Sequence, residues 1–102
     1  MNRYIISDEA IRDLDDISDY FLQTNVEAGE QFLKAFNTKC QQLANFPSIG
    51  RSYAHIRQDI RGLALRGFTI MYRVSNLQNT FKIEILRVVS GRRDLEKLFS
   101  TD

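Results

Sequence analysis

The chain has 102 residues, 43% of them apolar, and a formal net charge of +1 at pH 7. This length allows one modest hydrophobic core, so we expect residues 1–102 to form a single domain. The lone cysteine, Cys40, excludes an internal disulfide framework and a cysteine-rich zinc site. The sequence has no apolar run near the roughly 20 residues of a membrane-spanning helix, and its N-terminus lacks an apolar signal-peptide core. We therefore expect a cytoplasmic protein without metal or cofactor.

The small net charge conceals an asymmetry between the two halves of the chain. Residues 1–50 carry four Lys and Arg against eight Asp and Glu, a net charge of −4. Residues 51–102 carry ten against five, a net charge of +5. The excess of cations favours an anionic partner for the C-terminal half. The alternative is that the two halves neutralise each other across the fold.

The first elements are predicted to be a short strand over residues 3–6 and an amphipathic helix that Ser7 caps. Asp8 and Glu9 fall in the first turn, where the helix dipole favours negative charge. We expect the helix to end near Leu22 or Gln23. Its inward stripe has helical spacing and comprises Ile11, Leu14, Ile17 and Phe21. We interpret the aspartates Asp13, Asp15, Asp16 and Asp19 as a solvated helix face and not as a metal site.

A second helix follows almost at once. Thr24 and Glu27 have the spacing of a capping box, and Asn25 is the alternative cap. Its inward stripe comprises Phe32, Phe36, Cys40 and Leu43, with Leu33 beside it. Cys40 is therefore expected to be a small buried apolar residue and not a nucleophile. Pro47 ends the helix, because the residue before a proline is driven out of the helical region. The short link predicts an antiparallel helix hairpin.

The rest of the chain has strand character. Residues 47–59 are expected to be irregular and contain the only histidine, His55; residues 60–66, 68–74 and 81–89 are predicted strands. Arg66-Gly67 and residues 75–79 are predicted turns. In the last strand we expect Ile83 and Ile85 on one face and Leu86 and Val88 on the other. Residues 94–99 form a short helix or tuck against the body. The order predicts an α+β fold, β-α-α-β-β-β, with the helix hairpin on one face of a largely antiparallel sheet.

Conventional catalytic residue sets are absent. A Ser-His-Asp triad would have to use His55, which has no nucleophile signature near it. The C-terminal half instead offers arginines, whose planar guanidinium suits phosphate or carboxylate: Arg61, Arg66, Arg73, Arg87, Arg92 and Arg93, with Tyr72 among them. They could orient RNA in a ribonuclease or form a non-catalytic protein-binding surface. Because no group in this cluster titrates near pH 7, binding is favoured over catalysis.

The order and spacing of several motifs resemble the ParE branch of the ParE/RelE toxin superfamily, the plasmid-stabilisation toxins of type II toxin–antitoxin pairs. The resemblance covers nearly the whole chain. It rests on Ser7-Asp-Glu-Ala10 with the helix to Tyr20, on Phe46-Pro-Ser-Ile-Gly-Arg51, on Ile60-Arg-Gly-Leu63 and Ile70-Met-Tyr-Arg-Val74, and on Ile85-Leu-Arg-Val-Val-Ser-Gly-Arg-Arg-Asp94.

The resemblance implies a strand–helix–helix–three-strand fold, a cognate ParD-like antitoxin and inhibition of DNA gyrase by binding. Two alternatives remain: a RelE-like endoribonuclease that cleaves messenger RNA on the ribosome, and a non-toxic relative that only binds an antitoxin. Ser90 stands where many relatives have histidine. Because serine does not accept a proton near neutral pH, Ser90 argues against the ribonuclease alternative.

Three sets of site residues follow from the resemblance. The expected target-binding residues are Arg66, Arg73, Arg87, Ser90, Gly91, Arg92 and Arg93, in and before the Gly91–Asp94 turn. A ribonuclease would instead use Arg61, Tyr72, Arg73 and Arg87. An acidic, apolar C-terminal antitoxin segment that folds on binding would anchor on Tyr4, Phe68, Met71, Leu86 and Phe99, each of which could equally belong to the core.

Overall fold

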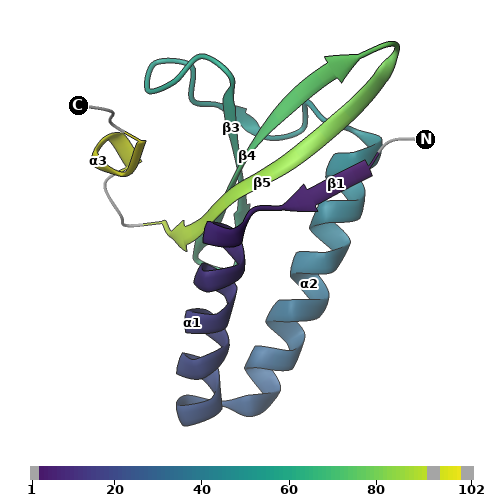
Figure 1. Ribbon diagram of the computed structural model, residues 1–102. Coiled ribbons are helices and arrows are strands. Elements are labelled where there is room, and N and C mark those ends of the chain that lie inside the picture. The colour runs from purple at the N-terminus through teal and green to yellow at the C-terminus, as the bar shows by residue number, and fades with distance from the viewer. Residues whose placement is uncertain (1–2, 92–94, 100–102) are drawn as a thin grey trace.

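The computed structural model describes residues 3–91 and 95–99, and its elements alternate as expected for an α+β protein. They are β1 (Arg3–Ile6), α1 (Asp8–Thr24), α2 (Val26–Asn45), β2 (Arg51–Ser52), β3 (Ile60–Leu65), β4 (Phe68–Leu77), β5 (Thr80–Ser90) and α3 (Leu95–Phe99). The strands form one sheet in the order β1-β5-β4-β3-β2. Among the strands of the described residues, only the β1–β5 pair is parallel. The predicted fold, a helix hairpin against a largely antiparallel sheet, is confirmed (Figure 1).

The helix hairpin is joined without a linker. Ser7 caps α1 as predicted, and its hydroxyl accepts a hydrogen bond from the Ala10 N–H at 3.1 Å. Asn25 ends α1 and also begins α2, because its backbone N–H bonds to the Phe21 carbonyl while its side chain accepts the Ala28 N–H. The cap of α2 is therefore Asn25 and not Thr24, whose hydroxyl donates to the Tyr20 carbonyl. For the same reason α1 runs to Thr24, beyond the predicted end.

The main core lies between the hairpin and the sheet. The predicted α2 stripe is confirmed: Phe32, Phe36, Cys40 and Leu43 are buried against sheet residues that include Ile70, Tyr72, Ile83 and Ile85. The α1 stripe is shifted by one position at its start. Ala10 is fully buried there and Ile11 is 45% exposed, because a small side chain lets the beginning of α1 approach β5 closely.

A β-bulge decides which side chains of β5 face the helices. Met71 pairs with Arg87, whereas the next residue of β4, Tyr72, pairs with Ile85, so Leu86 is an extra residue on β5. Val88 consequently packs in the helix-side core with Ile85, and the prediction that it shares a face with Leu86 is wrong. Leu86 packs on the opposite face, in a second cluster with α3.

The loops are more ordered than the sequence predicts. The segment 47–59 contains the short strand β2, which pairs with β3. The Arg66-Gly67 turn is confirmed, and both residues have positive φ (48° and 83°), as a two-residue hairpin loop of type I′ requires. The second predicted turn is too long: β4 continues to Leu77, and only Gln78 and Asn79 turn, again with positive φ. Among the described residues, no helix has the length and apolar character that crossing a membrane requires.

Candidate functional site

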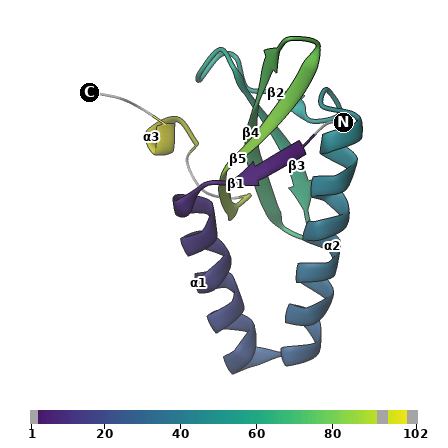
Figure 2. The ribbon, with the colours of Figure 1, turned by 45° about the vertical axis from the view of Figure 1, so that its right-hand side comes forward.

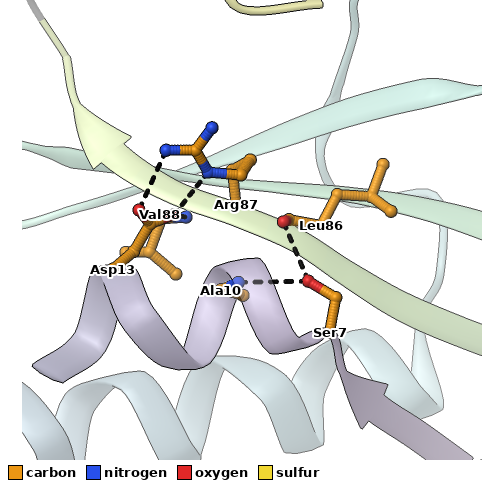
Figure 3. Close-up of polar contacts among 6 residues, drawn as sticks. All are labelled: Ser7, Ala10, Asp13, Leu86, Arg87 and Val88. Carbon is orange, nitrogen blue, oxygen red and sulfur yellow. Dashed lines mark hydrogen bonds and ion pairs between the residues drawn. The ribbon is translucent and has the colours of Figure 1, made fainter.

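The beginning of α1 is fastened to the bulge of β5 by a charged cluster (Figure 3). Arg87 donates two hydrogen bonds to the Asp13 carboxylate, Nε to Oδ2 at 2.7 Å and Nη2 to Oδ1 at 2.9 Å. The backbone N–H of Val88 donates to the same Oδ2 at 2.9 Å. The Ser7 hydroxyl, besides capping the helix, donates to the Leu86 carbonyl at 3.0 Å. Two backbone groups of β5, the Leu86 carbonyl and the Val88 N–H, thus have their partners in the side chains of Ser7 and Asp13.

Asp13 was missed as a structural residue, and its interpretation as part of a solvated face is wrong. Its side chain is only 13% exposed, because it stands three residues after Ala10 and four before Ile17, the two buried residues of α1. That helical spacing was the available signal. The hydrogen bond to Asp13 raises the pKa of Arg87, and the nearby negative charge adds to this effect. Asp15, Asp16 and Asp19 are exposed, as predicted.

A hollow of about 290 Å³, which we call the α3 hollow, opens beside this cluster. Its charged lining includes Arg57, Arg73, Arg87, Glu9 and Glu84; its apolar lining comprises Leu86, Leu98 and Phe99. Arg73 bonds Glu84 through Nε at 2.8 Å and Nη2 at 2.7 Å. Both Arg73 and Arg57 also lie within 4 Å of Asp59. Every arginine of this hollow therefore faces a carboxylate.

These ion pairs bear on the charge asymmetry of the sequence. Arg87 is neutralised by Asp13 from the acidic half of the chain, whereas Arg73 is neutralised by Glu84 from its own half. Arg73 and Arg87, the two sheet arginines that line the α3 hollow, are thus compensated within the fold. An anionic partner would have to displace a carboxylate before it could bind Arg73 or Arg87.

Tyr72 is completely buried, and its hydroxyl is fully engaged in the fold. The hydroxyl donates to the Pro47 carbonyl at 2.7 Å and accepts the Gly50 N–H at 3.0 Å, while Arg61 Nη1 donates to the Gly50 carbonyl at 2.8 Å. Burial raises the pKa of Tyr72, opposed by smaller contributions from the Gly50 hydrogen bond and the Arg61 charge. A Cβ atom on Gly50 would overlap this hydroxyl. Tyr72 therefore holds the loop after α2 against the sheet.

The residues considered for ribonuclease chemistry are divided between two places. Arg61 and Tyr72 are partners on β3 and β4 and meet at Gly50 on the helix side of the sheet. Arg73 and Arg87 line the α3 hollow. This arrangement does not direct the four side chains toward one reacting atom.

A second group of expected target-binding residues meets at the turn between β3 and β4. The Gly91 N–H donates to the Gly67 carbonyl at 2.9 Å, and Ser90 pairs with Phe68. Arg66 is exposed there and makes no ion pair within residues 3–91 and 95–99. A broad hollow of about 450 Å³, which we call the turn hollow, is lined by Asp16, Ile17, Tyr20, Gly67, Phe68 and Ser90. Arg92 and Arg93 lie outside the described residues.

The expected antitoxin anchors are split between the two sides of the sheet. Tyr4 and Phe68 pack against the helix-side core, where the Phe68 ring meets Phe32 edge-on with centroids 5.2 Å apart. Met71, Leu86 and Phe99 belong to the α3-side cluster. Met71 is completely buried and presents no surface while α3 is packed against it. Of the partly buried anchors, Phe68 lines the turn hollow and Leu86 and Phe99 line the α3 hollow, whereas Tyr4 lines neither.

Comparison with known proteins assigns the chain to a family. Residues 4–95 match the family model described as the ParE toxin of the type II toxin–antitoxin system parDE. The chain is 31% identical over 97 residues to Toxin ParE1 of Mycobacterium tuberculosis, from strain CDC 1551 / Oshkosh and from strain ATCC 25618 / H37Rv, covering 94% of this chain and 96% of each relative. A solved chain of the chromosomal ParDE TA system from P. aeruginosa superposes with a TM-score of 0.71. The superposition covers 88% of this chain and 96% of the solved chain at 22% identity, and it supports the fold.

Proposed function

Because the chain belongs to the ParE toxin family of type II toxin–antitoxin systems, we propose that it inhibits DNA gyrase by binding and that a cognate ParD-like antitoxin neutralises it. The inhibition would take place in the cytoplasm, where gyrase acts. The gyrase target is what the family resemblance implies. The chemistry of this chain supports a binding mode of action over a catalytic one.

The burial of Tyr72 is the observation that carries this proposal. A general acid or base must reach the reacting atom and titrate near the working pH. The Tyr72 hydroxyl already donates one hydrogen bond and accepts another inside the fold, and burial raises its pKa. Ser90 supplies no proton acceptor near neutral pH. A toxin that acts by binding needs neither property.

We assign the gyrase contact to the end of the sheet that holds the β3–β4 turn and the end of β5. Arg66, Ser90 and Gly91 are exposed and adjacent there, and the segment continues into Arg92 and Arg93. Arg66 makes no ion pair among the described residues, so an acidic protein surface or a DNA phosphate could bind it without displacing a carboxylate. Arg73 and Arg87 would join this contact only if Glu84 and Asp13 released them.

We further propose that the antitoxin neutralises the toxin by covering the same surface. Phe68, an expected antitoxin anchor, lines the turn hollow together with Ser90. Leu86 and Phe99 line the α3 hollow together with Arg73 and Arg87. An acidic, apolar antitoxin segment that entered either hollow would therefore lie on expected target-binding residues. Neutralisation would follow from steric exclusion.

The test is a gyrase supercoiling and DNA-cleavage assay with the purified chain, with and without the product of the adjacent gene. We expect inhibited supercoiling and trapped cleavage complexes that the partner reverses. Arg66→Glu should weaken the inhibition, whereas Arg12→Glu, an equal charge change at an exposed position of α1, should leave it unchanged. Equal inhibition by both folded variants would remove the turn from the target surface.

A folded but inactive chain in this assay would overturn the gyrase proposal. Primer extension on messenger RNA after induction would then separate the other two functions. New cleavage ends within codons would indicate the ribonuclease, and complex formation without any growth effect would indicate a non-toxic antitoxin-binding relative.

A further inference from the structure

The distal half of the helix hairpin exposes large apolar side chains. Leu22, Val26 and Leu33 are 66%, 54% and 45% exposed. They border a hollow of about 240 Å³ between the end of α1 and the start of α2, with Phe21 and Gly29 also in its wall. We call it the hairpin hollow. The junction between α1 and α2 lies at the end of the hairpin remote from the sheet (Figures 1 and 2), so the sheet does not cover these residues.

The hollow follows from how the two helices approach each other. A Cβ atom on Gly29 would lie 2.7 Å from the Phe21 Cβ, so only glycine permits this contact. On α2, Val26 and Leu33 are seven residues apart and lie on one side of the helix, flanking Glu30. On α1, Leu22 lies four residues after Ser18 on the side that borders the same hollow. Apolar side chains at this spacing on two helices form a groove of the kind that receives an amphipathic helix.

The charges around the hairpin hollow are mostly acidic, with Lys34, four residues after Glu30 on α2, as the nearest cation along the chain. From Asp13 to Leu33 the chain carries no Lys or Arg. Five exposed carboxylates lie in this stretch: Asp15, Asp16, Asp19, Glu27 and Glu30. Glu30 lines the hollow directly, while Asp19 and Asp15 precede Leu22 by three and seven residues and so share its side of α1. Unlike Asp13, none of these five side chains makes a salt bridge within the described residues.

We propose that the hairpin hollow docks a basic amphipathic helical segment of a partner protein. The exposed leucines and valine offer apolar burial, and the surrounding carboxylates select a cationic partner over an anionic one. A second copy of this chain would bring two acidic rims together and be repelled. An acidic antitoxin segment would be repelled in the same way. The surface is therefore separate from the one assigned to gyrase and the antitoxin, and it does not depend on that assignment.

The test uses a two-heptad peptide of leucine and lysine with helical amphipathic spacing, titrated into the ¹⁵N-labelled chain and followed by NMR. We expect chemical-shift changes centred on residues 18–33 and no comparable binding of the leucine–glutamate counterpart. Leu22→Gln combined with Leu33→Gln should weaken binding at least about tenfold, which corresponds to about 1.4 kcal/mol. Both positions are exposed, and glutamine has a helix propensity close to that of leucine, so the variant should fold.

Two control variants make the experiment decisive. Ile49→Gln removes a similarly exposed apolar side chain in the loop after α2 and should leave binding unchanged. Neutralising Asp19 and Glu30 together should weaken binding and reduce its salt dependence, whereas neutralising Asp8 and Asp16 should have a smaller effect. The proposal is overturned if the glutamate peptide binds equally, if the Leu22 and Leu33 substitutions have no effect, or if the free chain dimerises through these residues.

Discussion

The two halves of α1 place an aspartate side chain in opposite circumstances. Asp13 bonds Arg87 and the Val88 N–H, and it fastens the helix to the sheet. Asp19, six residues later, is exposed on the side of α1 that carries Leu22 and makes no salt bridge among the described residues. The difference indicates that a charged side chain with a partner in the same chain contributes to the stability of the fold. Exposed charges that gather around uncovered apolar side chains are candidates for recognition.

Substitution of Asp13 should therefore have the largest effect on stability. Asp13→Ala leaves the Arg87 guanidinium and the Val88 N–H without their partner in a half-buried site, and we expect a loss of about 3 kcal/mol. Asp15→Ala, a matched change on the exposed face, should change the free energy of unfolding by less than about 0.5 kcal/mol. Urea denaturation of the two variants measures the difference. Equal losses would mean that the contact of Asp13 with Arg87 and Val88 contributes no more to stability than the exposed Asp15 side chain does.

The hydrogen bonds of the Tyr72 hydroxyl to Gly50 and Pro47 test whether an uncharged group also contributes to stability. Tyr72→Phe removes only the hydroxyl and leaves the buried Gly50 N–H without an acceptor, so we expect a loss of about 2 kcal/mol. The ring and its packing are retained. Tyr53→Phe, which alters a partly buried tyrosine in the loop that Tyr72 holds, is the matched control and should change stability much less. A small loss in Tyr72→Phe would reopen a role for this hydroxyl in chemistry.

Repeating patterns made most of the fold predictable from the sequence. The α2 stripe at helical spacing, the Ser7 cap and the Arg66-Gly67 turn each follow from local rules, and all three are confirmed. The bulge at Leu86 could not be predicted in this way, because it depends on the pairing of β4 with β5. Its consequence, the inward position of Val88, was therefore predicted wrongly.

The candidate site was harder to predict, because it depends on which charges find partners in space. The sequence indicates that arginines collect in the C-terminal half, but the pairing of Arg87 with Asp13 spans 74 positions of the chain. No local pattern specifies a contact of that range. The Tyr72–Gly50–Arg61 arrangement is likewise a contact between distant segments. The exposure of Leu22 and Leu33 also emerges only when the two helices are placed against each other.

Cys40 extends the comparison to a neutral group inside the core. Burial raises the pKa of its thiol from about 9 to about 12. Between these values the unfolded chain releases the thiol proton while the folded chain retains it. This thiol should therefore lower stability by about 1.4 kcal/mol per pH unit as the pH rises above about 9. Cys40→Ala has no thiol, so its stability should fall less between pH 9 and 10 than that of the unaltered chain. A cavity left by the substitution would lower stability at every pH and would not change this difference in slope. Equal slopes in urea denaturation would show that the thiol is accessible to water.

The acidic rim of the hairpin hollow permits the smallest but most discriminating measurement. Asp19 follows Asp15 by four residues and Asp16 by three, so it forms two like-charge pairs that destabilise α1. Asp19→Lys converts both into attractive pairs, and we expect a gain of about 0.5 kcal/mol in the free energy of unfolding. Glu27→Lys makes the same charge change in the first turn of α2, where the helix dipole favours a carboxylate, and should lose a few tenths of a kcal/mol. A gain at Asp19 would mean that the carboxylate is retained at a cost to stability, as expected for a residue kept for recognition. A loss there would mean that Asp19, like Asp13, serves the fold.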